Sequence, residues 1–78
     1  MDIGTRVYAY PGWWTNGYWG TVTEVLQEGV TTYYKVSLDN DTVSDFRSNN
    51  LYLDGETFGG KRLYDPKRST AVEFIKGL

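Results

Sequence analysis

Turn-forming residues interrupt this chain at short intervals, and they constrain the fold more than any other feature. Between the turns lie short runs rich in aromatic and β-branched residues, which favour strands over long helices. The clearest run spans residues 30–38, where side chains alternate strictly between two faces. The pattern predicts a mainly β fold with about five or six short strands. The turn signals are Pro11-Gly12, Asn16-Gly17, Glu28-Gly29, Asp39 to Asp41, Asp54-Gly55 and Gly59-Gly60.

The alternation also predicts which residues build the core. One face of the run 30–38 should point inward and pack against Val7, Val22 and Leu51. That face consists of Val30, Thr32, Tyr34, Val36 and Leu38. Gly20 predicts a bulge or a bend in its strand. The strands are expected at 5–10, 18–27, 30–38, 42–46 and 51–53, with a 3₁₀ turn at 47–50. The segment 56–58 is expected to form a hairpin with 51–53 across Asp54-Gly55, and 61–64 is an optional last strand.

The C-terminal residues follow a different pattern. Asp65 is a good helix N-cap and Pro66 suits the first helical position. Apolar residues then recur at helical spacing until Gly77, a natural stop. Residues 1–64 are therefore expected to form a small barrel, and residues 65–78 a short C-terminal helix packed on or beside it.

Composition excludes several classes of function. The chain has no cysteine and no histidine, so it offers no disulfide, no imidazole base and no His or Cys zinc ligand. We expect no metal and no cofactor. The N-terminus lacks the pattern of a signal peptide, and no apolar run is long enough to cross a membrane. A cytoplasmic, non-membrane protein is expected, either a monomer or a weak homodimer.

The segment 9–20, "AYPGWWTNGYWG", places five aromatic residues beside sharp turns. Two explanations are open: the aromatics cap a small core, or the loop is a binding surface. Trp13 and Trp14 are neighbours, and neighbours on an extended chain point in opposite directions. We therefore expect at least one of these two to be exposed, and Trp19 to lie in the core.

Several segments between residues 4 and 53 resemble SH3-like barrels of the Tudor, chromo-barrel and KOW kind. The matching residues are Gly4 and Val7, Tyr18 to Val22, Tyr34 to Val36, Asp39 and Leu51. The resemblance implies a barrel that binds ligands at a loop edge. Tudor and chromo-barrel domains hold methylated lysine or arginine in an aromatic cage. Tyr18 or Trp19, with Tyr10 or Trp13, matches half of such a cage, but residues 37–40 lack the other aromatics.

These observations predict a non-catalytic module that recognises a protein or peptide. The expected ligand-binding residues are Tyr10, Trp13, Trp14, Tyr18 and Tyr33, bordered by the acidic residues Asp39, Asp41 and Asp45. The acidic residues are alternatively ordinary turn residues. Catalysis is not expected, because the sequence Val43-Ser44-Asp45-Phe46 keeps only the valine of the active-site motif of plasmid-type dihydrofolate reductase, another small SH3-like barrel.

The alternative function is a KOW-like accessory protein associated with nucleic acid, such as a phage-encoded regulator. Residues 1–56 carry three basic and eight acidic side chains, a balance of −5, whereas residues 57–78 carry five basic and two acidic ones, a balance of +3. Nucleic acid would therefore bind at the basic C-terminal flank. That flank consists of Lys61, Arg62, Lys67 and Arg68.

Overall fold

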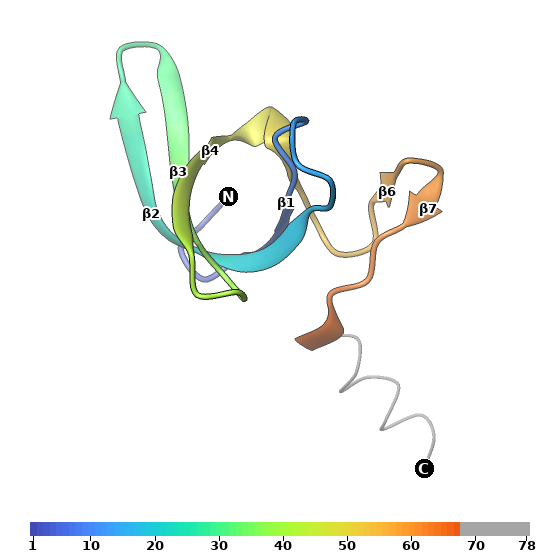
Figure 1. The fold of residues 1–78 in the computed structure, drawn as a ribbon. Helices are drawn as coiled ribbons and strands as arrows, with labels where there is room; N and C mark the ends of the chain where they lie inside the picture. The colour runs from blue at the N-terminus through green and yellow to red at the C-terminus, as the bar shows by residue number, and fades with distance from the viewer. Residues whose placement is uncertain (68–78) are drawn as a thin grey trace.

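The computed structural model describes residues 1–67, and within them the chain is mainly β (Figure 1). Five antiparallel strands form one sheet in the order β4-β3-β2-β1-β5. The first four strands follow each other as a meander, and a 3₁₀ turn then returns the chain to pair β5 with β1. The elements are β1 (Arg6–Ala9), β2 (Tyr18–Glu28), β3 (Thr31–Leu38), β4 (Val43–Arg47), the 3₁₀ turn η1 (Ser48–Asn50) and β5 (Leu51–Tyr52).

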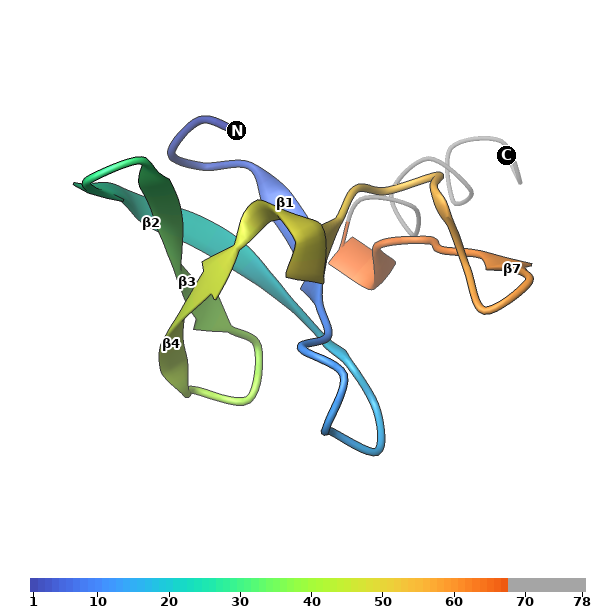
Figure 2. The ribbon, with the colours of Figure 1, turned by 90° about the horizontal axis from the view of Figure 1, so that it is seen from above.

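A separate two-stranded ribbon follows the sheet. Strands β6 (Thr57–Phe58) and β7 (Lys61–Arg62) pair around Gly59 and Gly60, which both have positive φ. The ribbon stands to one side of the sheet (Figure 2). The ring of Phe58 attaches it by packing against the rings of Tyr8, Tyr10 and Tyr52 at centroid distances of 5.6, 5.0 and 4.9 Å.

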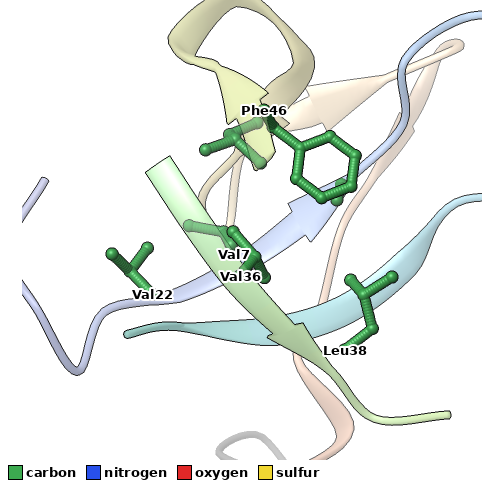
Figure 3. Packing of buried hydrophobic residues seen from close by; sticks show 7 residues of the cluster. Val7, Val22, Val36, Leu38 and Phe46 are labelled. Carbon is green, nitrogen blue, oxygen red and sulfur yellow. The ribbon is translucent and has the colours of Figure 1, made fainter. Parts of the chain in front are cut away.

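The core lies on the concave face of the sheet and is small (Figure 3). The prediction for Val7, Val22, Val36, Leu38 and Leu51 is confirmed, since all five are buried. Ala9 and Phe46 complete the buried cluster, and Tyr34 packs against its edge.

Two core predictions were wrong. The first part of the predicted inward face is not core: Val30 is fully exposed, because it belongs to the turn that precedes β3. Thr32 is only half-buried, and its hydroxyl donates to the Gln27 side chain at 2.7 Å. Trp19 is only half-buried, and it lies on the convex face, where its ring meets that of Tyr8 at 5.5 Å. The alternation explains the second error: Gly20 and Val22 point into the core, so Trp19 must point away from it.

The sheet curves because β2 is irregular. The register with β3 shifts between Val22 and Glu24, which places Thr23 in a β-bulge, and bulges increase local twist. The bulge was expected at Gly20, but Gly20 instead allows β2 and β3 to approach each other closely. A Cβ there would lie 2.7 Å from the carbonyl oxygen of Ser37, so only glycine lets β2 and β3 approach this closely.

The predicted closed barrel is not observed among residues 1–67. Strand β5 contains two residues and pairs with β1, whereas β4 pairs with β3, and no ladder joins β4 to β5. The η1 turn separates these two strands and leaves the sheet open between them. The expected strand 51–53 also forms no hairpin with 56–58, because β6 pairs with β7 instead.

The predicted C-terminal helix falls mostly on residues 68–78, which lie outside the described residues. The described residues contain no C-terminal helix element; Pro66 and Lys67 alone have helical backbone, and the backbone N–H of Lys67 donates to the Asp65 carboxylate at 3.0 Å. Within residues 1–67 there is no helix long and apolar enough to cross a membrane.

Candidate functional site

The aromatic loop, defined here as residues 10–17, joins β1 to β2 and is fixed at both ends. The backbone N–H of Tyr10 donates to the carbonyl oxygen of Asn50 at 2.9 Å. At the other end, the N–H of Gly17 donates to the Tyr8 hydroxyl at 3.0 Å. Any Cβ at position 17 would overlap the Tyr8 ring, so glycine is required for this contact. The loop is therefore anchored at one end to η1 and at the other to β1.

The two adjacent tryptophans of the loop have different environments. Trp13 is 80% exposed, the most exposed aromatic ring among the large apolar side chains of residues 1–67. Trp14 is half-buried, because its ring meets those of Tyr18 and Phe46 edge-on at 5.5 and 5.7 Å. The prediction that at least one of the two is exposed is confirmed. Trp14 attaches the loop to the core, and Trp13 is presented to solvent.

Two open grooves flank the tryptophans, and both rings line both grooves. The first, called the β4 groove, has a volume of about 420 Å³ and lies beside strand β4. Besides the tryptophans, it is lined by Pro11, Tyr33, Ser44, Asp45, Phe46, Arg47 and Asn50. The second, called the turn groove, has a volume of about 490 Å³ and is also lined by Thr15, Asn16, Tyr18, Leu38, Asn40 and Thr42.

The structure brings together most of the predicted aromatic site. Tyr33 lines the β4 groove and Tyr18 lines the turn groove, each beside Trp13 and Trp14. Tyr10 lies elsewhere: its ring packs on Phe58 at 5.0 Å and helps to hold the β6–β7 ribbon. Tyr10 therefore lines neither groove, although it belongs to the same loop.

The turn groove combines aromatic and polar side chains. Trp13, Trp14 and Tyr18 line one side of it. Asn40 and Thr42, from the turn between β3 and β4, line the other side and offer amide and hydroxyl groups. Of the four residues that the cage resemblance singled out, Trp13 and Tyr18 line this groove, whereas Tyr10 and Trp19 pack on Phe58 and Tyr8.

The three acidic residues that were predicted to border the site have separate environments. Only Asp45 lines a groove with the tryptophans. Asp41 has φ 69° and is exposed in the β3–β4 turn, where the N–H of Thr42 donates to the Asn40 side chain at 3.2 Å. This is the turn chemistry that was the alternative explanation for the acidic cluster.

Asp39 is part of a structural network centred on Arg6. The Arg6 guanidinium donates to both carboxylate oxygens of Asp39, at 2.8 and 2.9 Å, and to both of Asp65, at 2.9 Å each. It also donates to the Thr21 hydroxyl at 3.1 Å. Asp65 is completely buried. The network ties the β3–β4 turn and the segment after β7 to strand β1, so Asp39 has a structural role here.

The network shifts the ionisation of its members. Hydrogen bonds from Arg6 lower the pKa of Asp39 and of Asp65 below the usual value, although burial opposes the shift in both. Hydrogen bonds to Asp39 and then Asp65 raise the pKa of Arg6 above its usual value. All three groups therefore stay charged at neutral pH.

Three residues of the predicted basic flank lie among the described residues, and all three are exposed. Lys61 and Arg62 are exposed on β7, whereas the ammonium of Lys67 lies 3.3 Å from the Asp39 carboxylate. Arg68 lies outside the described residues. Lys67 is thus partly neutralised by the Arg6 network, and two described cations remain on the β6–β7 ribbon.

Sequence reasoning missed Arg6 and Asp65 as a pair. They are 59 positions apart, and no periodicity links an arginine at the start of a strand to an aspartate that precedes a proline. The one available signal was Asp65 itself, which was correctly interpreted as a cap. Its burial and its bidentate partner depend on the tertiary fold.

No family model, curated protein or solved structure matches this chain. The site must therefore be interpreted from its own geometry.

Proposed function

We propose that this protein is a non-catalytic binding module that recognises a protein or peptide segment through the aromatic loop. The observation that carries the proposal is the 80% exposure of Trp13 on a loop fixed at both ends. Exposing a tryptophan to water costs free energy, and a fixed ring loses little entropy when a partner covers it. Tryptophans in such positions often dominate the energy of an interface.

The grooves define what the partner must offer. Each groove is lined by aromatic rings together with polar side chains. An apolar or aromatic side chain of the partner would pack on Trp13. Backbone and polar groups would bond to Asn50 and Asp45 in the β4 groove, or to Asn40 in the turn groove.

We further propose that the curved sheet is an open form of the SH3-like barrel that the sequence resembles. The strand order, with β5 returning to β1 after a 3₁₀ turn, supports this proposal. In this frame the aromatic loop and the β3–β4 turn form the ligand-binding edge that the resemblance implies. The fold alone does not establish function, so the proposal depends on the exposed loop.

Affinity capture from lysate tests the proposal. The wild-type chain, Trp13→Ala and Tyr64→Ala are immobilised side by side, with and without nuclease treatment. Tyr64 is a matched control, because it is 61% exposed and lies outside the loop. We expect a protein that the wild type and Tyr64→Ala retain, that Trp13→Ala loses, and that nuclease does not release.

Two outcomes would contradict the proposal. Capture that survives Trp13→Ala would remove the loop from the interface. Capture that nuclease abolishes, and that weakens when Lys61 and Arg62 are replaced by glutamate, would favour the nucleic-acid alternative.

A further inference from the structure

Strand β4 has a free edge. It is the last strand of the sheet and pairs only with β3 within residues 1–67. Proteins usually protect such an edge with prolines, lysines, bulges or very short strands. The other end of the sheet is protected by length, since β5 has two residues. Strand β4 has five residues, a regular register with β3, and neither proline nor lysine.

The pattern of hydrogen bonds between β3 and β4 determines which backbone N–H and C=O groups of β4 point towards the free edge. Leu38 donates its N–H to the carbonyl oxygen of Thr42 at 2.7 Å, which directs the even-numbered residues of β3 towards β4. Ser44 and Phe46 are the β4 partners of even-numbered β3 residues. The backbone groups of Val43, Asp45 and Arg47 consequently point away from β3, because directions alternate along an antiparallel strand.

The side chains on this edge are also available. Asp45 and Arg47 are exposed, and neither forms an ion pair within the described part of the chain. Lys35 is the cross-strand neighbour of Asp45, but its ammonium lies 3.6 Å from the Glu24 carboxylate. Val43 is 56% exposed. The edge therefore displays an acidic and a basic residue two positions apart.

We propose that β4 pairs antiparallel with β4 of a second copy of this chain, with the two-fold axis at Phe46. In this register Asp45 lies opposite Arg47 of the second copy, and Arg47 opposite its Asp45. Both residues point their backbone groups at the edge, so each opposed pair can exchange two backbone hydrogen bonds. Each pair also joins opposite charges across the strands.

The charges on β4 favour the register centred on Phe46 over the register centred on Asp45. A shift of the two-fold axis to Asp45 keeps the backbone groups in phase but sets the two Asp45 carboxylates directly opposite each other, which is unfavourable. Two antiparallel copies of Asp45-Phe46-Arg47 place opposite charges across from each other only when the two-fold axis passes through Phe46. A second copy of the chain is thus an occupant whose charges fit this edge.

The pairing would also enlarge the aromatic surface. Phe46 contacts Trp14, with ring centroids 5.7 Å apart. Two Phe46 residues opposed at the axis would therefore bring both aromatic loops to one face of a continuous sheet. The pairing uses the backbone and charges of β4 rather than Trp13, so it does not require the proposed function. Asp45, Phe46 and Arg47 also line the β4 groove, however, so a second copy would compete with a peptide in that groove and would leave the turn groove free.

Sedimentation equilibrium of the full chain, at concentrations up to about 1 mM, tests the proposal. Four proteins are compared: wild type, Asp45→Arg, Arg47→Asp and the double variant with both substitutions. We expect reversible dimers of the wild type. Each single variant creates two like-charge pairs and should raise the dissociation constant about tenfold or more. The double variant restores opposite charges and should return to within about threefold of wild type.

Thermal unfolding of all four proteins confirms that the exposed substitutions leave the fold intact. Amide exchange is a second measurement: protection of the Asp45 and Arg47 N–H groups should rise with protein concentration. A wild type that is monomeric throughout the range would overturn the proposal. So would a double variant that dimerises no better than the single variants, or a dimer that Trp13→Ala dissociates and the charge changes do not affect.

Discussion

Replacing Arg6 with methionine removes the centre of the charged network while keeping an unbranched side chain. The buried Asp65 carboxylate then loses both of its 2.9 Å hydrogen bonds from the guanidinium and keeps the one from the Lys67 N–H. Leaving one partner of a buried ion pair without the other costs about 3–5 kcal/mol. A chain of 78 residues has a total stability of about 4–12 kcal/mol, so this change removes a large part of it.

Urea unfolding at pH 7 and at about pH 4 measures this effect. The lowered pKa values of Asp39 and Asp65 mean that the wild-type network stabilises the fold above the unfolded-state pKa of about 3.9, and that this stability is lost as the pH falls through the folded pKa values. In Arg6→Met, burial without a cation raises the pKa of Asp65, so the carboxyl is protonated more readily and the penalty shrinks in acid.

The expected difference from wild type is therefore large at pH 7 and smaller at pH 4. Adding Asp65→Leu to Arg6→Met should recover part of the loss, because no buried charge remains. Arg62→Met, at an exposed position on β7, is the control and should change stability by less than about 0.5 kcal/mol. A loss below about 1 kcal/mol at pH 7, or a loss that grows in acid, would refute the reasoning.

Two further predictions concern packing. Gly20→Ala should destabilise the fold by about 1–3 kcal/mol in urea unfolding, because the new Cβ would press on the Ser37 carbonyl oxygen; a neutral effect would mean that β2 and β3 can separate at no cost. Phe58→Ala should detach the β6–β7 ribbon from the three tyrosine rings that it contacts. Amide exchange should then accelerate in the ribbon while β2 and β3 stay protected, and uniform acceleration throughout would show that the ribbon is part of the main cooperative unit.

Local patterns predicted the strands of the sheet well. Alternation in 30–38 located β3 and its buried residues Val36 and Leu38, although the same face is not buried at Val30 and Thr32. The turn at Asp39 to Asp41 forms with the left-handed backbone at Asp41 that the residue types favour. The 3₁₀ turn after β4 was also expected and is confirmed. These features depend on neighbours in the sequence, which is why the sequence reveals them.

The errors have a common physical origin. Trp19 was assigned to the core because it is large and apolar, but the alternation along β2 places it on the convex face beside Tyr8. Tyr10 was assigned to the binding site, but the β6–β7 ribbon covers it through Phe58. A second aromatic cluster on the outer face could be recognised only once the ribbon was known to fold back there.

The candidate site was predicted in part. The exposed tryptophan of the loop was expected from the opposite directions of neighbouring residues on an extended chain, and Trp13 confirms it. Which of the two would be exposed depended on Phe46, whose contact with Trp14 joins distant parts of the chain. The structural role of Asp39 likewise required Arg6, 33 positions away.

The most direct test of the proposed function is the affinity of the captured partner for three proteins: wild type, Trp13→Ala and Tyr64→Ala, measured by calorimetry. The account predicts that Trp13→Ala weakens binding by about 30-fold, the effect of losing about 2 kcal/mol at an interface hot spot. The same change should leave unfolding stability within about 0.5 kcal/mol of wild type, because Trp13 is 80% exposed. Equal affinities for wild type and Trp13→Ala, or an equal loss in Tyr64→Ala, would contradict the account.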